Sequence, residues 1–460
     1  MKSKLVSIAL VLMLLVAALM QISGVVHDRQ TYRQIAIQSV AQSLAGAQTL
    51  TGPLIHRACT EEWDITVDKQ VRTERREFHL QAAPASLSVR GSSQLEPRTR
   101  GLHATQVFNL KAQLTAQWAD LAALIPVAEH ANSRMNCGLP LLMLAVSDAR
   151  GIRHASLKTG DQSPVLKPGT FYGSYPRGVH ASLPAPLLSS GALEAQLELE
   201  LVGTESISIV PLGGDTQVRL TSNWPHPSFG GQFLPVERKI TDQGFEASWR
   251  VSSLASTAQQ DVAQRKGVCS VAGDAAPHAS GACVEAFSVS FIDPANTYAL
   301  SDRATKYGLL FIGLTFLAVG LFEFMKSLRV HPIQYFLVGA AMSMFFLLLV
   351  SLSEHMSFGA AYAVATAACV LLLTVYACYM LQSAWRGVPF GLGISVLYGM
   401  LFVLLQIEQT ALLVGAVALF AVLAAIMLLT RRVDWYARFT QSPAEAGAEA
   451  FNASGLAPQK

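Results

Sequence analysis

The sequence has few charged residues. Of its 460 residues only 14% are Asp, Glu, Lys or Arg, whereas 51% belong to the hydrophobic set. A soluble domain usually carries roughly 25% charged residues, so the composition excludes an ordinary cytosolic globular protein. It also excludes a disordered chain, which needs high charge and few apolar residues.

The sequence also lacks the short motifs that mark common catalytic and metal sites. It holds no GxSxG, HExxH, GxxxxGK[S/T] or GxGxxG pattern. It has no CxxC pair and no Cys/His cluster with the spacing of a zinc site. No charge falls near the middle of an apolar segment, which argues against a proton or ion carrier. We therefore expect no catalytic residue, no cofactor and no metal.

The charges that are present gather in one block. Residues 27–305 hold 24 of the 34 Lys and Arg residues and 25 of the 31 Asp and Glu residues. This block is almost neutral, so it offers no basic surface for nucleic acid. The pattern predicts a soluble domain of ordinary composition between apolar segments.

The apolar segments have the length of membrane helices. The first, residues 5–26, follows Lys2 and Lys4; it is longer than a cleaved signal and lacks a small-x-small cleavage site, so we expect a retained anchor. Five more runs each approach the roughly 20 residues that cross a bilayer: 308–324, 333–352, 358–381, 388–406 and 410–429. The sequence thus predicts six transmembrane helices, arranged as one plus five.

Basic residues in the short loops predict the orientation. With a cytoplasmic N-terminus, the outer short loops hold no Lys or Arg, and the inner segments hold seven basic residues: Lys2, Lys4, Lys326, Arg329, Arg386, Arg431 and Arg432. The opposite short loops hold only Glu354, His355 and Glu408 as ionisable residues. We therefore expect a multi-pass protein of the bacterial inner membrane, with both termini cytoplasmic and the large domain periplasmic.

Strand patterns dominate the large domain. The ranges 108–118 and 193–201 alternate strictly between apolar and polar residues, as half-buried strands do. The ranges 206–211 and 216–220 flank Gly213-Gly214 and predict a hairpin, and 284–292 predicts another strand. We expect an antiparallel, β-rich and sandwich-like fold.

Helical patterns are fewer there. Residues 29–50 either continue the first membrane helix or pack beside it, and Gly52-Pro53 ends this segment. Residues 120–130 favour a short helix that Pro126 weakens. The predicted organisation is an anchor (1–26), a periplasmic β-rich domain (27–305), a five-helix transmembrane bundle (306–430) and a mostly disordered cytoplasmic tail (431–460).

Four of the six cysteines fall in the external domain, where oxidation is permitted. Cys269 and Cys283 bracket a loop rich in Gly and Ala and suit a disulfide, which leaves Cys59 with Cys137 as the second pair. Four cysteines allow three connectivities, and the sequence leaves these open.

Two further clusters are candidates for function. The loop of Trp224, Pro225, Pro227 and Phe229 suits a binding groove, but rigid packing of two aromatic residues is the better explanation. Glu354, His355 and Glu408 share the external ends of the membrane helices and offer a polar site at the membrane surface. Solvation of the loops explains them more simply.

Several motifs together resemble a known family, and they run from about residue 29 to 436. They are Gln48 to Pro53, Ser147 to Ile152, Trp224 to Phe229 with Phe233 to Pro235, Arg303 to Ile312, His331 to Tyr335, Ser351 to His355, and Thr430 to Tyr436. These segments, with one anchor and five C-terminal helices, resemble the CreD family of bacterial inner-membrane cell envelope integrity proteins.

The resemblance implies a role in envelope integrity and stress response, with expression under a two-component regulon. It supplies no catalytic residue. We expect a scaffold or modulator, embedded in the lipid bilayer, whose external domain binds an envelope protein, a lipid or a peptidoglycan-related partner. Two alternatives remain: a transporter or flippase-like protein that uses Glu354, His355 and Glu408, and an envelope-modifying enzyme.

Overall fold

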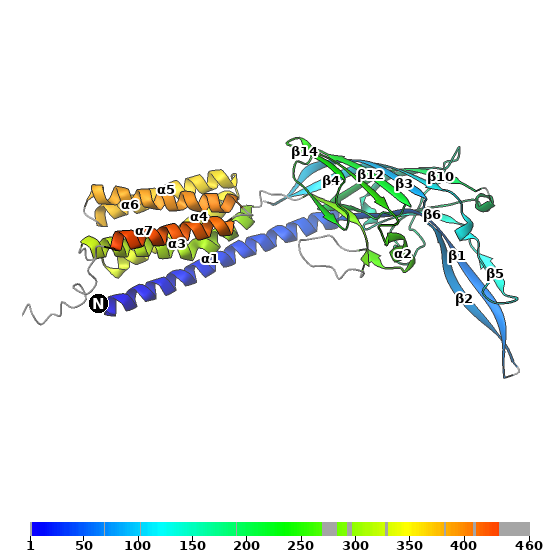
Figure 1. Cartoon of the computed structure of the whole chain (residues 1–460), viewed down its shortest axis with the longest axis horizontal. Coiled ribbons are helices and arrows are strands. Elements are labelled where there is room, and N and C mark those ends of the chain that lie inside the picture. Colours follow the sequence, from blue (N-terminus) through cyan, green and yellow to red (C-terminus); the bar gives the residue numbers. More distant parts are fainter. Residues whose placement is uncertain are drawn as a thin grey trace, which may run out of the picture. The chain divides into compact units, whose positions relative to one another are not determined.

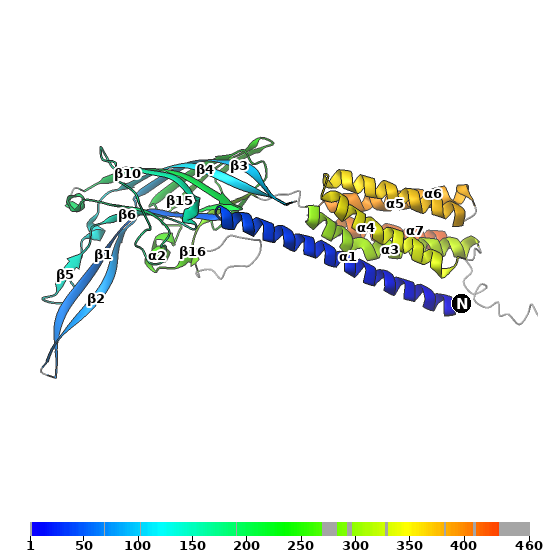
Figure 2. The ribbon, with the colours of Figure 1, turned by 180° about the vertical axis from the view of Figure 1, so that it is seen from behind.

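The chain forms two compact units. The computed structural model describes residues 2–68, 70–101, 103–189, 191–268, 283–291, 297–326, 330–380, 383–407 and 411–431. One unit comprises Met1–Val26 with Thr297–Lys460, and the other comprises His27–Asn296. The first is helical and the second is built mainly of strands (Figures 1 and 2). Helix α1 (Lys2–Ser43) contributes to both.

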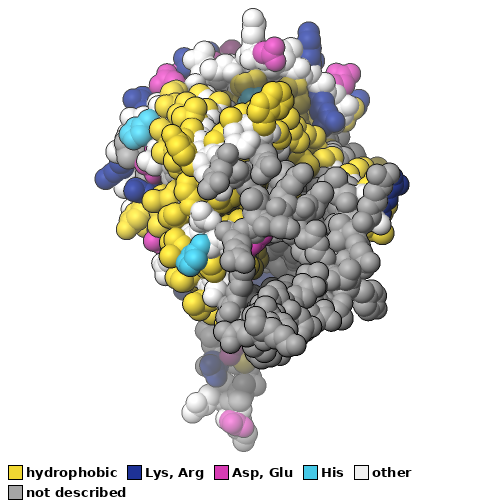
Figure 3. Space-filling view, turned by 90° about the vertical axis from the view of Figure 1, so that its left-hand side faces the viewer, with side chains coloured by type: hydrophobic (Ala, Val, Ile, Leu, Met, Phe, Trp, Pro, Cys, Tyr) yellow, Lys and Arg dark blue, Asp and Glu magenta, His cyan; other side chains and the backbone are white. Residues whose placement is uncertain are grey.

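The helical unit packs its helices around buried aromatic side chains. Its elements are the N-terminal part of α1, α3 (Thr297–Lys326), α4 (Pro332–Ser353), α5 (Phe358–Met380), α6 (Ala384–Gln406) and α7 (Ala411–Thr430). Phe311, Phe345 and Tyr398 are fully buried, and Leu15 and Leu19 of α1 join the same core. Many large apolar side chains face outward instead, and Figure 3 shows hydrophobic side chains gathered on the side where these helices lie in Figure 1.

In the described part of the chain, four helices are long and apolar enough to cross a membrane. They are Val6–Ser43, Pro332–Ser353, Phe358–Met380 and Gly387–Gln406.

Two large sheets form the second unit. The first has the strand order β13-β18-β11-β1-β6-β9-β8, with β2 and β5 also paired to β1. Its strands are β1 (Gln48–Val67), β2 (Gln70–Ala82), β5 (Arg134–Cys137), β6 (Leu141–Val146), β8 (Lys167–Pro168), β9 (Gly178–Ser182), β11 (Ser206–Ile209), β13 (Pro227–Gly231) and β18 (Phe287–Phe291).

The second sheet has the order β14-β15-β12-β3-β4-β10-β7. Its strands are β3 (Ser86–Arg100), β4 (His103–Trp118), β7 (Ile152–Lys158), β10 (Leu193–Thr204), β12 (Asp215–Ser222), β14 (Glu237–Thr241) and β15 (Gly244–Ser252). The remaining elements are short: β16 (Gly267–Val268), β17 (Cys283–Val284), α2 (Ala258–Ala263), η1 (Ala122–Leu124), η2 (Ala149–Gly151) and η3 (Ala185–Ser189).

The inner faces of the two sheets share one apolar core. In β10 the odd-numbered residues from Leu193 to Leu201 are buried, while most of the residues between them are exposed. This is the period of two expected of a strand with one face in water. Leu142 and Leu144 of the first sheet join this core. The large unit is therefore β-rich and has two packed layers.

The predicted hairpin around Gly213-Gly214 is wrong. Strand β11 lies in the first sheet and pairs with β1 and β18, whereas β12 lies in the second sheet and pairs with β3 and β15. The two glycines carry the chain from one sheet to the other. A Cβ on Gly213 would lie 2.9 Å from the Leu87 nitrogen, and one on Gly214 would lie 2.7 Å from the Ala85 oxygen. Only glycine fits this crossing.

Other predicted boundaries also move. Helix α1 ends at Ser43 and not at Gly52-Pro53, because the chain from Gln48 onward pairs with β11. Only the three residues of η1 are helical within 120–130. Half of the Trp224 loop is strand β13, paired with β18. Helix α3 begins at Thr297, so the large unit ends at Asn296 and not at residue 305.

Candidate functional site at the end of helix α1

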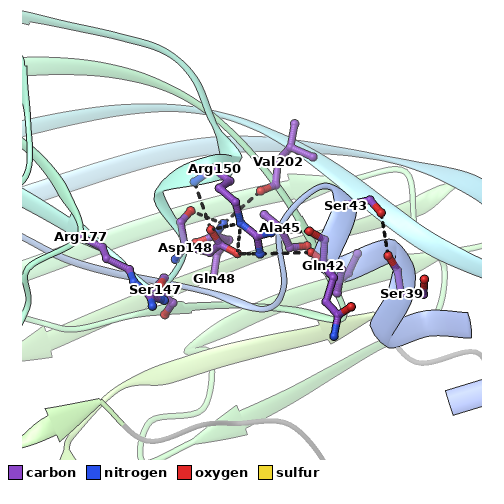
Figure 4. Close-up of polar contacts among 12 residues, drawn as sticks. Ser39, Gln42, Ser43, Ala45, Gln48, Ser147, Asp148, Arg150, Arg177 and Val202 are labelled. Carbon is purple, nitrogen blue, oxygen red and sulfur yellow. Dashed lines mark hydrogen bonds and ion pairs between the residues drawn. The ribbon is translucent and has the colours of Figure 1, made fainter. Parts of the chain in front are cut away.

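Two arginines of the β-rich unit, Arg100 on β3 and Arg150 on the η2 turn, hold the C-terminal end of α1. Arg150 donates hydrogen bonds to the carbonyl oxygens of Gln42 and Ala41, and Arg100 donates to the Ser39 oxygen at 3.2 Å. The last turn of α1 has no basic residue of its own. Because exposed carbonyls give that end of a helix partial negative charge, the two guanidinium groups stabilise it. Figure 4 shows Arg150 directed at the helix end.

Asp148 fixes Arg150 in this position. The Arg150 Nη2 atom lies 2.6 Å from the Asp148 Oδ2 atom, and the Arg150 backbone N–H also donates to the Asp148 carboxylate. These bonds to Arg150 hold the pKa of Asp148 below its usual value. The ion pair therefore stays formed over the neutral pH range and orients Arg150 toward the helix.

Gln48 joins three segments of the chain at the same place. Its side chain is fully buried. The amide nitrogen donates to the carbonyl oxygens of Asp148 at 3.0 Å and of Val202 at 3.1 Å, and the amide oxygen accepts from the Asp148 N–H at 3.2 Å (Figure 4). Gln48 thereby links the start of β1 to the η2 turn and to β10.

Glycines make this close approach possible. A Cβ on Gly151 would lie 2.2 Å from the Val202 oxygen and 2.5 Å from the Gln48 amide nitrogen. A Cβ on Gly203 would lie 2.8 Å from the Gly46 oxygen. We call the contacts of Gln42, Gln48, Asp148, Arg150 and Gly151 the anchor junction.

The anchor junction unites two motifs that lie 100 residues apart in the sequence. Gln48 begins one of the family-like segments, and Asp148, Arg150 and Gly151 belong to another. The sequence identified both segments but gave no sign that they touch. The junction has a mechanical role, because its hydrogen bonds fix the sheets to the C-terminal end of helix α1.

A buried histidine cluster lies elsewhere in the same unit. His56 on β1 is 1% exposed, and its Nε2 atom lies 2.9 Å from the Thr170 carbonyl oxygen. A carbonyl only accepts, so Nε2 carries the proton. Among the described residues the buried Nδ1 atoms of His56 and His79 have no hydrogen-bond partner. Burial lowers the pKa of both histidines, and the nearby charge of Arg265 lowers that of His79 further.

This cluster predicts loss of stability in acid. Well above a pH of about 6.5, the ordinary pKa of histidine, both histidines are neutral in the folded and unfolded chain. Below that pH the unfolded chain binds protons more readily than the folded one, so stability falls. We expect the unfolding midpoint of His56→Gln to depend less on pH between about 6.5 and 5. His154→Gln, at an exposed histidine, is the control. Equal slopes for His56→Gln and the unchanged protein in thermal unfolding would contradict this.

A buried carboxylate, that of Glu61, lies midway along the β1–β2 hairpin. Burial alone raises the pKa of Glu61, but hydrogen bonds from the His130 and Glu129 N–H groups and the Ser133 hydroxyl, with the charge of Arg76, outweigh it and lower the pKa to about 2. Nothing in the sequence singled out Glu61 or His56, because their burial follows from strand pairing alone.

The structure places the remaining predicted site residues as follows. Cys59 and Cys137 form a disulfide, and Cys283 is also disulfide-bonded, whereas Cys269 lies outside the described residues. Trp224 donates to the His226 oxygen at 2.9 Å, and Phe229 packs against Phe245 and Trp249 at the edge of the core. These contacts make the loop of Trp224, Pro225, Pro227 and Phe229 part of the packing.

The structure describes two of the three residues of the predicted polar site at the membrane surface. Glu354 is the C-cap residue of α4, and its carboxylate accepts a hydrogen bond from the Tyr298 hydroxyl at 3.4 Å. His355 is exposed. Glu408 lies outside the described residues. No group of three or more His, Cys, Asp or Glu side chains suited to a metal occurs in the part of the chain that the structure describes.

The apolar helices and a β-rich unit of this size define an integral membrane protein. The family model described as "Inner membrane protein CreD" matches residues 1–436. The curated protein "Inner membrane protein CreD" of Escherichia coli (strain K12) is 34% identical over 435 residues, which cover 94% of this chain and 93% of the relative. The chain belongs to the CreD family of inner membrane proteins.

Solved structures add little to this assignment. An M1 zinc metallopeptidase from Deinococcus radiodurans matches 36% of this chain and 38% of its own length, with 12% identity and a TM-score of 0.21. This chain thus spans well under half of that protein. At so low a score the likeness supports no conclusion about fold or activity.

Proposed function

We propose that this chain is a six-span inner-membrane protein that supports the integrity of the cell envelope. In this proposal both termini are cytoplasmic, and the unit of residues 27–296 lies in the periplasm. That unit acts as a scaffold or modulator that binds an envelope protein, a lipid or a peptidoglycan-related partner. The distribution of basic residues in the loops supports the orientation, and the Cys59–Cys137 disulfide suits an oxidising compartment.

The observation that carries the proposal is the anchor junction. A large domain is held at the end of an apolar helix by a buried Gln48 and by Arg150, whose hydrogen bonds join segments that lie far apart in the chain. Such an arrangement suits a domain that must be held at a membrane. It includes no nucleophile paired with a base, so it suits binding better than catalysis.

Complementation tests the proposal. A strain without this protein should regain tolerance to envelope-damaging detergent when it expresses the full chain. We expect Gln48→Ala, which leaves buried backbone groups without partners, to restore tolerance poorly at equal expression. Glu354→Ala combined with His355→Ala should restore it fully. If only the second variant fails, the transporter-like alternative with Glu354, His355 and Glu408 is the better proposal.

A further inference from the structure

The outer face of the second sheet carries an unusual pair of arginines. Strands β3 and β12 are parallel neighbours, and their register places Arg219 directly opposite Arg90. Both residues are exposed and lie on the face away from the core, since Val89 and Val218 next to them are buried. Like charges at directly opposed positions destabilise a sheet. The fold therefore gains nothing from this pair.

Neighbouring charges do not neutralise the pair. The nearest carboxylate to Arg219 is that of Glu246, at 3.8 Å, which is a loose contact. The Lys111 ammonium group forms an ion pair with Glu200 at 3.2 Å, and the Arg250 guanidinium group forms one with Asp215 at 3.3 Å. Within the described ranges the Arg90 guanidinium group has neither an ion pair nor a hydrogen bond.

Two hollows in the sheet surface meet at the arginine pair. One of about 500 Å³ lies over β3, β4, β10 and β12 and reaches β7, and one of about 330 Å³ lies over β3, β12 and β15 and reaches β14. Arg90 and Arg219 line both. Strands β3, β4, β10 and β12 are labelled in the upper part of the strand-built unit in Figure 1. The pair thus sits at the centre of a shallow depression, where an anion can reach both guanidinium groups.

The residues around the pair indicate the kind of ligand. Around the pair, the uncharged outward-facing side chains of β3, β4 and β12 are hydroxyls and amides: Ser88, Ser92, Gln113, Gln217 and Thr221. His154 and the exposed Val236 also line the hollows, on the sides of the edge strands β7 and β14. Hydroxyls and amides hydrogen-bond sugar hydroxyls, whereas an acyl chain or an apolar peptide finds little exposed apolar surface there beyond Val236. Glu198 and Glu200 on β10 repel a densely charged polyanion.

We propose that this face binds a sparsely charged anionic glycan. A carboxylate or phosphate group of the glycan lies between Arg90 and Arg219, and its sugar hydroxyls contact the surrounding polar side chains. Guanidinium groups bind both anions through paired N–H donors. The inference names a ligand class for the domain and so rests on the proposed function. A binding measurement tests it separately, because complementation can succeed while glycan binding fails.

Binding to the full chain in phosphatidylcholine nanodiscs tests the proposal. The probes are tetragalacturonic acid, a phosphorylated tetrasaccharide, an uncharged galactose tetramer and a glutamate tetrapeptide. We expect one or both charged saccharides to bind, with affinity that falls as salt rises. Arg90→Gln and Arg219→Gln should each weaken that binding about tenfold. Arg98→Gln, on the same strand but outside both hollows, should leave it unchanged.

The unfolding midpoint without ligand gives a second measurement. Because Arg90 and Arg219 repel each other, Arg90→Gln should raise the midpoint slightly while it weakens binding. A lower midpoint would mean that Arg90 stabilises the fold, and would overturn the proposal. So would equal binding of the uncharged tetramer, tighter binding of the glutamate peptide, or binding of neither charged saccharide.

Discussion

Replacement of Gly151 by valine should destabilise the β-rich unit by on the order of 3 kcal/mol, because two costs combine. The new Cβ would lie 2.2 Å from the Val202 oxygen, so η2 and β10 must move apart. That movement also separates Gln48 from the carbonyl groups of Asp148 and Val202 and leaves buried polar atoms without partners. The result should appear as a lower unfolding midpoint.

Hydrogen exchange locates the effect. The Thr204 N–H donates to the Gly46 oxygen at 3.1 Å, and the Asp148 N–H donates to Gln48, so both should exchange faster in Gly151→Val. Gly46→Ala is the control: Gly46 lies beside the junction, two residues before Gln48, but an added Cβ there meets no atom within 4 Å. We expect that variant to keep the unfolding midpoint. Equal stability of the two variants would show that the junction tolerates a side chain and is looser than described.

The amphipathic strands were predictable from the sequence, but their neighbours were not. Alternation from Phe108 to Trp118 predicted β4, and that from Leu193 to Leu201 predicted β10. A period of two shows which face of a strand is buried. It does not show which strand is its neighbour, or whether the two strands run parallel or antiparallel. The hairpin prediction at Gly213-Gly214 was wrong for this reason, because it assumed that two strands adjacent in the sequence pair with each other.

The candidate sites depend on exactly those missing pairings. Gln48 and Asp148 were each part of a recognised motif, but only the fold brings them together. In the sequence, Arg90 and Arg219 look like ordinary exposed residues of two separate strands. They lie opposite each other only because β3 pairs in parallel with β12. Such a pairing joins residues about 130 positions apart and leaves no local trace in the sequence.

Loss of the disulfide between Cys59 and Cys137 should lower the stability of the oxidised protein by about 4 kcal/mol, because the bond closes a long loop in the unfolded chain. The two residues are 78 apart in sequence and lie opposite each other in the β1–β5 pairing. We expect the double variant Cys59→Ala, Cys137→Ala to unfold at lower denaturant concentration. Cys378→Ala, at a free cysteine, should not change the midpoint.

The same bond tests on which side of the membrane the domain lies. Disulfides persist in the periplasm and are kept reduced in the cytosol. If residues 27–296 are periplasmic, Cys59 and Cys137 in cells should react with a maleimide-polyethylene glycol reagent only after reduction and unfolding. Modification of both without reductant would place the domain in the cytoplasm and reverse the proposed orientation. Because β5 pairs with the first sheet over only four residues, the reduced protein should also expose β5 to protease first.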